Sequence, residues 1–172
     1  MLASRSVLLL ALLSCSRATP PPARSDETPE RQFILEGLRL EERRDGRVLW
    51  TGTGRRGDGD LSVSDVTDLV LVRKPQNPNE MEITLRAPRG HLAFDAGQAT
   101  FDAVRVAEPG GSLLTATRAH YDEGQGTLVG TGPIRYTTAS MRLDATGAIV
   151  SLRDGTVSVE GPVSGRLEKA RP

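Results

Sequence analysis

The chain has 172 residues, with 22 basic and 22 acidic side chains and a formal net charge of zero. A nucleic-acid-binding face needs an excess of basic residues, and a base-stacking platform needs aromatic rings. The chain has only three Phe, two Tyr and one Trp, so composition and charge argue against a nucleic-acid partner. Its length suffices for one domain with a hydrophobic core.

The first 14 residues have the pattern of an export signal. Arg5 precedes an apolar run over residues 7–13, which is far too short to span a bilayer as a helix but suits a signal peptide. Ser14 then precedes Cys15, the only cysteine of the chain. This resembles the lipobox of bacterial lipoproteins, in which the cysteine is acylated and becomes the new N-terminus. The alternative is an ordinary secretory signal with a chance cysteine.

These features predict three segments. Residues 1–14 form a lipoprotein signal peptide, residues 15–32 a Pro-rich extended tether, and residues 33–172 the folded domain. Acylation of Cys15 would hold the protein at the periplasmic face of a membrane, with the inner membrane preferred over the outer.

The domain has the patterns of an all-β protein. The Glu-rich composition of residues 35–44 allows a helix, but Leu38 and Leu40 alternate with polar residues before an Asp45-Gly46 turn signal, so a hairpin over residues 33–50 is favoured. Further alternation covers residues 81–87 and 156–159, and Gly, Asp, Asn or Pro bounds each run. We expect about ten to twelve antiparallel strands and no helix after residue 50.

Two stretches of the domain are near copies of each other. Ala87-x-Arg89-x-His91 with Phe94-Asp95-x-Gly97-Gln98 returns as Ala116-x-Arg118-x-His120 with Tyr121-Asp122-x-Gly124-Gln125. Each copy reads as a strand, a polar turn and a returning strand. Such repetition marks a stacked β architecture, in which one hairpin cannot bury its apolar face alone.

The polar residues of the repeat predict neither catalysis nor metal binding. His91 and His120 occupy equivalent positions, but a zinc site needs at least a third ligand, and the domain has no cysteine. We expect two half-buried strand histidines. Asp95 and Asp122 are expected to accept backbone N–H bonds of their own turns. We therefore predict no enzyme, no catalytic residue, no metal and no cofactor.

The informative chemistry is an apolar row along the strands. The predicted inward positions are Val63, Leu69, Leu71, Ile83, Leu85, Phe101, Val104, Leu128, Ile134, Tyr136, Leu143, Val150 and Val157. Two interpretations stay open for this row. The residues form a packed core, or they line a groove between two open sheets that receives acyl chains.

The domain resembles the OstA-like family of LptA and LptC, and LptC in particular. The matching elements are one N-terminal membrane element, residues 33–40, Asp45-Gly46-Arg47-x-x-Trp50 and the repeats with an aromatic-Asp pair. The resemblance covers about residues 33–165. It implies a single antiparallel β-jellyroll with two open, twisted sheets and an apolar interior. Many family members have a transmembrane helix, where this chain has Cys15.

The resemblance also implies a function and partners. The domain would receive lipid A acyl chains of lipopolysaccharide from the permease subunits of an inner-membrane ABC transporter. It would pass them to an LptA-like periplasmic protein through edge-strand pairing. The alternative is a structural or scaffolding β-sandwich lipoprotein of the cell envelope that binds only proteins.

Overall fold

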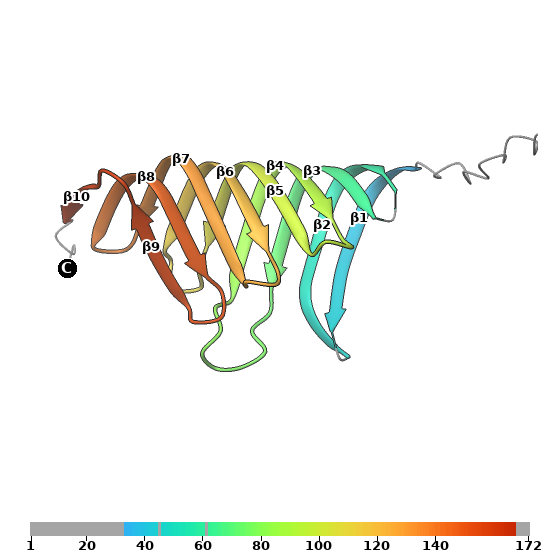
Figure 1. Ribbon diagram of the computed structural model, residues 1–172, viewed down its shortest axis with the longest axis horizontal. Coiled ribbons are helices and arrows are strands. Elements are labelled where there is room, and N and C mark those ends of the chain that lie inside the picture. The colour runs from blue at the N-terminus through green and yellow to red at the C-terminus, as the bar shows by residue number, and fades with distance from the viewer. Residues whose placement is uncertain (1–32, 45, 61, 168–172) are drawn as a thin grey trace, which may run out of the picture. The chain divides into compact units, whose positions relative to one another are not determined.

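The computed structural model describes residues 33–167 except residues 45 and 61. Every regular element in this part of the chain is a β-strand (Figure 1). The strands are β1 (Phe33–Arg44), β2 (Arg47–Gly59), β3 (Val63–Arg73), β4 (Ile83–Ala93), β5 (Gln98–Ala107), β6 (Leu113–Asp122), β7 (Thr127–Thr137), β8 (Met141–Ser151), β9 (Thr156–Glu160) and β10 (Ser164–Leu167).

All strands belong to one antiparallel sheet that follows the order of the chain. The order is β1-β2-β3-β4-β5-β6-β7-β8-β10, and β9 also pairs with β8. Short turns join most neighbours, which is the connection that antiparallel pairing allows. The prediction of an all-β, consecutive antiparallel fold is confirmed, and the predicted hairpin over residues 33–50 is β1 and β2.

A bend crosses the middle of the strands. Pairing of β3 with β4 runs to Thr67↔Arg89 and resumes at Leu69↔Ala87, and the other neighbouring long strands show similar interruptions. The interruptions coincide with left-handed backbone at Asp68 (φ 51°) and Ala103 (φ 49°). Such backbone costs about 1–2 kcal/mol for a residue with a Cβ. The bend therefore marks a line along which the sheet is forced to fold.

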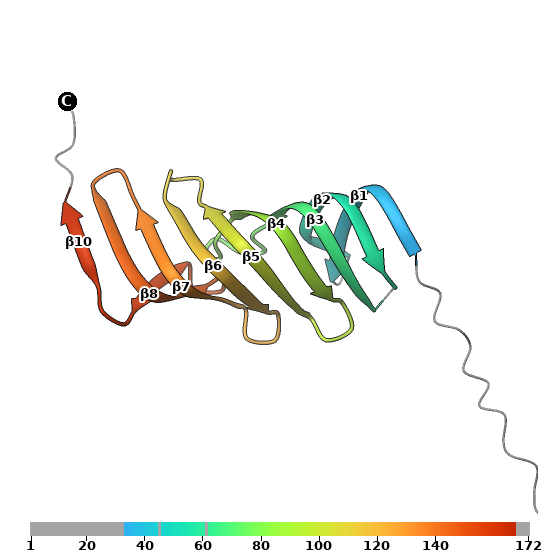
Figure 2. The same cartoon turned by 90° about the horizontal axis from the view of Figure 1, so that it is seen from above.

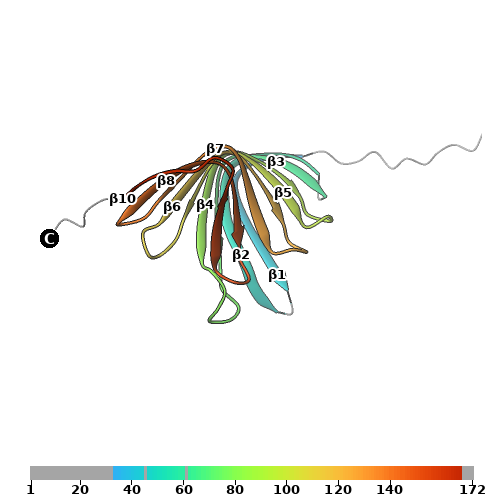
Figure 3. The same ribbon diagram turned by 60° about the vertical axis from the view of Figure 1, so that its left-hand side comes forward.

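The bend gives the sheet two walls. In the end-on view the strands descend on both sides of one ridge (Figure 3). We call residues 47–53 of β2 and their sheet neighbours wall A, and residues 118–122 of β6 and their neighbours wall B. The two sheets expected from the resemblance are thus two walls of one continuous, open sheet.

The last two strands follow the same rule. β9 pairs with residues 147–151 of β8 in wall B, whereas β10 pairs with residues 141–144 of β8 in wall A. Gly161, between them, has φ 85°. β9 and β10 are therefore the two arms of one more bent strand.

The core lies between the two walls and is built from large and small side chains in alternation. Phe101 on β5 is 2% exposed, and its sheet partners are Gly90 on β4 and Ala119 on β6. A Cβ on Gly90 would lie 2.6 Å from Leu69 Cδ2 and 3.2 Å from the Phe101 ring. The absence of a side chain at Gly90 therefore makes room for Phe101.

The search for membrane-spanning helices, made over the described residues, found no helix of the length and apolarity that a bilayer requires. The predicted signal peptide, Cys15 and the tether lie outside the described residues, as do residues 168–172 of the predicted domain.

Candidate functional site

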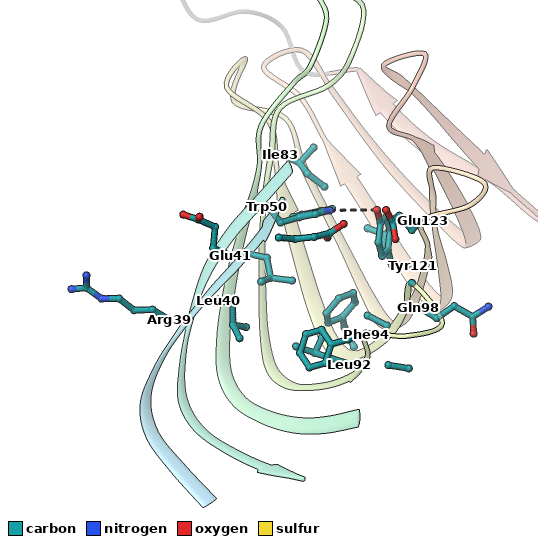
Figure 4. Close-up of a pocket in the computed structure, with 17 residues that line it drawn as sticks. Arg39, Leu40, Glu41, Trp50, Ile83, Leu92, Phe94, Gln98, Tyr121 and Glu123 are labelled. Atoms are coloured by element: carbon teal, nitrogen blue, oxygen red, sulfur yellow. Dashed lines mark hydrogen bonds between the residues drawn. The ribbon is translucent and has the colours of Figure 1, made fainter. Parts of the chain in front are cut away.

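A cavity of about 400 Å³ lies between the two walls at the N-terminal end of the sheet (Figure 4). β1 and β2 border it on one side and the tips of the β4–β5 and β6–β7 hairpins on the other. Its apolar lining is Leu40, Trp50, Leu71, Ile83, Leu92, Ala93, Phe94, Ala99, Phe101, Tyr121 and Leu128; its polar lining is Arg39, Glu41, Glu42, Gln98 and Glu123, with Gly97. The volume is within the usual range for ligand pockets, and a mostly apolar lining with a few polar groups is typical of them.

Strand alternation directs the lining residues inward. On β4, Leu92 is buried while His91 and Ala93 on either side are more exposed. On β1, Leu40 packs against the core while its neighbour Arg39 is exposed. Period-two pleating thus turns Leu40 and Leu92 inward, and their neighbours Arg39 and Ala93 contribute more exposed atoms to the lining.

Phe94 stands at the rim of this cavity. It follows β4 at the tip of the β4–β5 hairpin, and its side chain is 48% exposed. Its backbone N–H donates to the Ser62 carbonyl oxygen at 2.8 Å, which fixes the tip against the β2–β3 turn. A large, partly exposed apolar ring beside an apolar cavity is a surface that a hydrophobic ligand can cover.

Trp50 and Tyr121 meet across the cavity. Trp50 Nε1–H donates to Tyr121 Oη at 3.3 Å, and the ring centroids are 5.4 Å apart at an interplanar angle of 77°. This is the edge-to-face arrangement that aromatic quadrupoles favour. Trp50 is on β2 in wall A and Tyr121 on β6 in wall B, so the contact joins the two walls.

Ionisable groups flank this aromatic pair. Arg44 at the end of β1 forms an ion pair with Glu123 beyond the end of β6. Burial raises the pKa of the Glu42 carboxyl, and the positive charges of Arg44 and Arg73 partly oppose that shift. Burial also raises the pKa of the Tyr121 hydroxyl, against the effect of the hydrogen bond from Trp50. Both groups are half-buried, and this partial loss of hydration is the main cause of the two shifts.

The predicted inward row divides into three groups. Leu69, Leu71, Ile83, Leu85, Phe101, Val104, Leu128, Ile134 and Val150 are buried; Tyr136, Leu143 and Val157 are half-buried; Val63 is 38% exposed. Of these thirteen residues, the cavity is lined by Leu71, Ile83, Phe101 and Leu128. Most of the row is therefore packed core, and only its part near β1 and β2 faces open space.

The inward prediction for Val63 is wrong. The buried residues at the start of β3 are Ser64 and Val66, so the alternation is shifted by one position. The Asp60 carboxylate accepts the backbone N–H of Val63 at 2.7 Å, and the Ser64 hydroxyl donates to the Asp60 carbonyl oxygen at 2.9 Å. This turn sets the register of β3 and places the serine inside.

Sequence reasoning missed the other apolar lining residues, which are Leu40, Trp50, Leu92, Ala93, Phe94, Ala99 and Tyr121. Alternation of Leu38 and Leu40 could have found Leu40, and the aromatic positions of the repeat could have drawn attention to Phe94 and Tyr121. Alternation gives the face of a strand, but which distant strands meet depends on how the sheet folds along its bend.

The polar residues of the repeat lie on the outer face. His91 Nδ1 is 2.8 Å from Asp65 Oδ1, and His120 Nδ1 is 3.5 Å from the Thr100 hydroxyl. Both histidines are exposed, where half-buried ones were predicted. Among the described residues, no group of three or more metal-ligating side chains is close enough to hold an ion.

The turn aspartates occupy the β4–β5 and β6–β7 connections. Asp122 accepts the Gln125 backbone N–H at 2.9 Å, as expected from turn chemistry. Asp95 is exposed at the tip of the other hairpin. Neither carboxylate faces the cavity lining.

Comparison with known proteins finds a likeness among solved structures. No protein-family model matches the chain, and no curated protein matches it. Among solved structures, the chain is similar to LptH of Pseudomonas aeruginosa, described as the LptA-homologous periplasmic component of the lipopolysaccharide transport device. The identity is 8%, the TM-score is 0.32, and the match covers 81% of this chain and 96% of that chain. At this similarity, function has to be argued from this chain's own residues.

Proposed function

We propose that this chain is a periplasmic lipid-binding module of lipopolysaccharide export, whose groove carries lipid A acyl chains. The observation that carries the proposal is the apolar cavity of about 400 Å³ between the two walls, with the exposed Phe94 ring at its rim. Lipopolysaccharide is also the ligand that the sequence resemblance to LptA and LptC implies. Transfer of this kind makes and breaks no bond, so the module is proposed to be non-enzymatic.

The two ends of the sheet support a module that joins neighbours in a chain. Viewed from above, β1 and β10 lie at opposite ends of the sheet (Figure 2). Ile34 on β1 is 59% exposed and Leu167 on β10 is 83% exposed. Edge strands with exposed apolar side chains are suited to strand addition by a partner. We propose that one end receives acyl chains from the permease subunits of an inner-membrane ABC transporter and that the other passes them to an LptA-like protein.

One observation favours the scaffolding alternative. Outside the cavity the core side chains are buried, and a backbone hydrogen bond joins the two walls at their ends, because the Met81 N–H just before β4 donates to the Leu152 carbonyl oxygen just after β8 at 3.2 Å. A fully closed interior would leave only the sheet edges for binding, and the partners would then be proteins alone.

Photo-crosslinking in living cells distinguishes the two functions. p-Benzoylphenylalanine at Phe94 or Tyr121 replaces one aromatic ring by another at the cavity and should capture lipopolysaccharide. Matched controls at Arg105 and Arg135, which are exposed on the outer strand faces, should not. Capture of proteins alone at all four positions would contradict lipid transfer and support the scaffold.

The anchor is a separate part of the proposal. We propose that Cys15 is acylated and holds the domain at the periplasmic face of the inner membrane. Cys15→Ser should then release the protein into the soluble periplasmic fraction, measured by cell fractionation and immunoblotting. A variant that stays in the membrane fraction would show that residues 7–13 anchor it by themselves, and the lipobox interpretation would be wrong.

A further inference from the structure

Two contacts cross the groove at one end of the cavity. The first is the hydrogen bond and edge-to-face packing of Trp50 with Tyr121, and the second is the ion pair of Arg44 with Glu123. The sheet places β2 and β6 four positions apart. These contacts are therefore not part of strand pairing. We call these four residues the clasp.

The clasp and the cavity share side chains. Trp50, Tyr121 and Glu123 all line the cavity. In the close-up, the Trp50–Tyr121 contact lies toward one end of the lining, and Leu92 and Phe94 lie toward the other (Figure 4). The clasp therefore forms one end of the space, and the exposed Phe94 marks the open end.

The size of the cavity sets the amount of ligand that it can take. Its volume is about 400 Å³, and a methylene group is similar in size to a water molecule, whose share of the liquid is about 30 Å³. The cavity therefore holds on the order of a dozen carbon atoms. That is one acyl chain, not the several chains of a lipid A molecule.

The arginines at the clasp end of the cavity are already paired within the protein, and the Glu42 carboxylate lines the same end. Arg44 is paired with Glu123, and Arg73 donates to Glu80 Oε2 at 2.9 Å and to the Met81 carbonyl oxygen at 3.0 Å. A ligand phosphate or carboxylate would have to displace one of these partners and lose its own water. The site thus favours an uncharged chain inside with its head group left outside.

We propose that the cavity is a binding site for a single acyl chain of about a dozen carbons, and that the clasp closes one end of it. This inference rests on the proposed function, because it takes the ligand to be an acyl lipid. It adds that the module engages such a lipid through one chain at a time. Passage of a chain beyond this point requires the clasp to part.

Trp50 gives a direct probe, because it is the only tryptophan of the chain. The purified protein would be titrated with lysophosphatidylcholines brominated near the chain end, from about 8 to about 18 carbons, each below its critical micelle concentration. Each methylene that enters the cavity should tighten binding about fourfold. We expect saturable quenching of Trp50 by one lipid per protein, with affinity that rises to about twelve carbons and then levels off.

Two variants test whether the cavity is the site. Ala99→Phe and Ala93→Leu each add volume to the lining and should weaken binding at least tenfold, whereas Ala139→Phe in the exposed β7–β8 turn should leave it unchanged. Circular dichroism shows whether each variant is folded. If one cavity variant fails to fold, the binding affinity of the other tests whether the cavity is the site. Quenching that does not saturate, or that survives in a folded cavity variant, would overturn the site.

Tyr121→Phe tests the clasp. It removes the hydroxyl that accepts the Trp50 hydrogen bond but keeps the ring, so the clasp should open more readily and the affinity plateau should move to longer chains. An unchanged plateau would overturn the role of the clasp. If no single-chain lipid binds but the Phe94 crosslinker captures lipopolysaccharide in cells, this inference fails while the proposed function stands. If both fail, the proposed function fails as well.

Discussion

The two copies of the sequence repeat fold into equivalent hairpins that contribute differently to the groove. In the β4–β5 copy the aromatic at the hairpin tip, Phe94, is 48% exposed at the cavity rim. In the β6–β7 hairpin the turn begins at Glu123, so the aromatic of the second copy, Tyr121, lies on β6 at the position that Leu92 has on β4; it is half-buried and accepts the Trp50 hydrogen bond. The repeat thus specifies two hairpins, but its second half is displaced by two residues between them. The proposed binding function depends on positions where one copy differs from the other in surroundings.

A second difference lies deeper in the core. The position that is Gly90 in the first copy is Ala119 in the second, and both are sheet partners of Phe101. The first copy therefore has a glycine at this position, Gly90, which leaves room for the Phe101 ring. Both differences can be tested by changing the two copies in parallel.

The largest effect is expected for the large buried side chains of the two hairpins. Phe101→Ala on β5 should lower the free energy of unfolding by about 3–5 kcal/mol, and Leu128→Ala on β7 by about 2–5 kcal/mol. Both side chains are almost fully buried. Urea denaturation would measure these values. A loss below about 1 kcal/mol at Phe101 would show that this part of the interior is not packed as described.

Exchanging the small residues at positions 90 and 119 should change the free energy of unfolding less than the core truncations do. Gly90→Ala should destabilise the fold by about 1–3 kcal/mol, because the new Cβ would crowd the buried Leu69 and Phe101 side chains. Ala119→Gly removes a buried methyl and should cost about 1 kcal/mol or less. Thermal unfolding of both variants would check the order. A neutral Gly90→Ala would mean that the two copies tolerate the same residue.

The difference between Tyr121 and Phe94 can be tested by removing the hydroxyl from the first and adding one to the second. Tyr121→Phe should cost about 0.5–1.5 kcal/mol, because the Trp50 N–H loses its acceptor. Phe94→Tyr adds a hydroxyl at an exposed position and should change the unfolding free energy by less than about 0.5 kcal/mol. Equal effects in chemical denaturation would contradict the difference between the copies.

The smallest effect is expected for Glu42, which lies near Tyr121 and makes stability depend on pH. Burial raises the pKa of Glu42 in the folded state. The contribution of Glu42 to the free energy of unfolding is therefore fully present below the ordinary pKa of a glutamate and is lost as the pH rises through the raised pKa. Glu42→Gln should therefore be stabilising at neutral pH and should reduce the loss of stability as the pH rises above the ordinary pKa of a glutamate.

Glu80 provides the opposite control. Burial acts to raise the pKa of Glu80, but hydrogen bonds from Gln76 and Arg73 and the positive charge of Arg73 outweigh it, so the pKa is lowered. Its contribution is present above its ordinary pKa and is lost as the pH falls. Glu80→Gln should thus destabilise the protein at neutral pH. The midpoints of urea unfolding would be measured for both variants across the pH range. If Glu42→Gln and Glu80→Gln shift the midpoint in the same direction at neutral pH, this account is contradicted.

Much of the fold follows from local patterns. Alternation, turn residues and the repeat are properties of neighbouring residues, and they predict antiparallel strands, hairpins and nine of the buried side chains. Val63 was misplaced because hydrogen bonds to Asp60 set the start of β3, and alternation alone could not show which of two neighbours faces inward.

The candidate site was harder to predict, because it depends on contacts far apart in the sequence. Trp50 and Tyr121 meet only since the sheet bends along one line and twists, which brings β2 opposite β6. The bend includes left-handed backbone at Asp68 and Ala103. A glycine at these positions would have suggested such backbone from the sequence, whereas Asp and Ala do not. The cavity is a consequence of that geometry rather than of any motif.

The central claim is that the interior near β1 and β2 binds lipid A through the cavity. Native mass spectrometry of the purified protein, titrated with lipid A, measures this directly. The account predicts a one-to-one complex that is retained in Ala139→Phe and lost in Ala99→Phe. If no complex forms, or if the folded Ala99→Phe variant binds as well as the unaltered chain, then the cavity is not the lipid site.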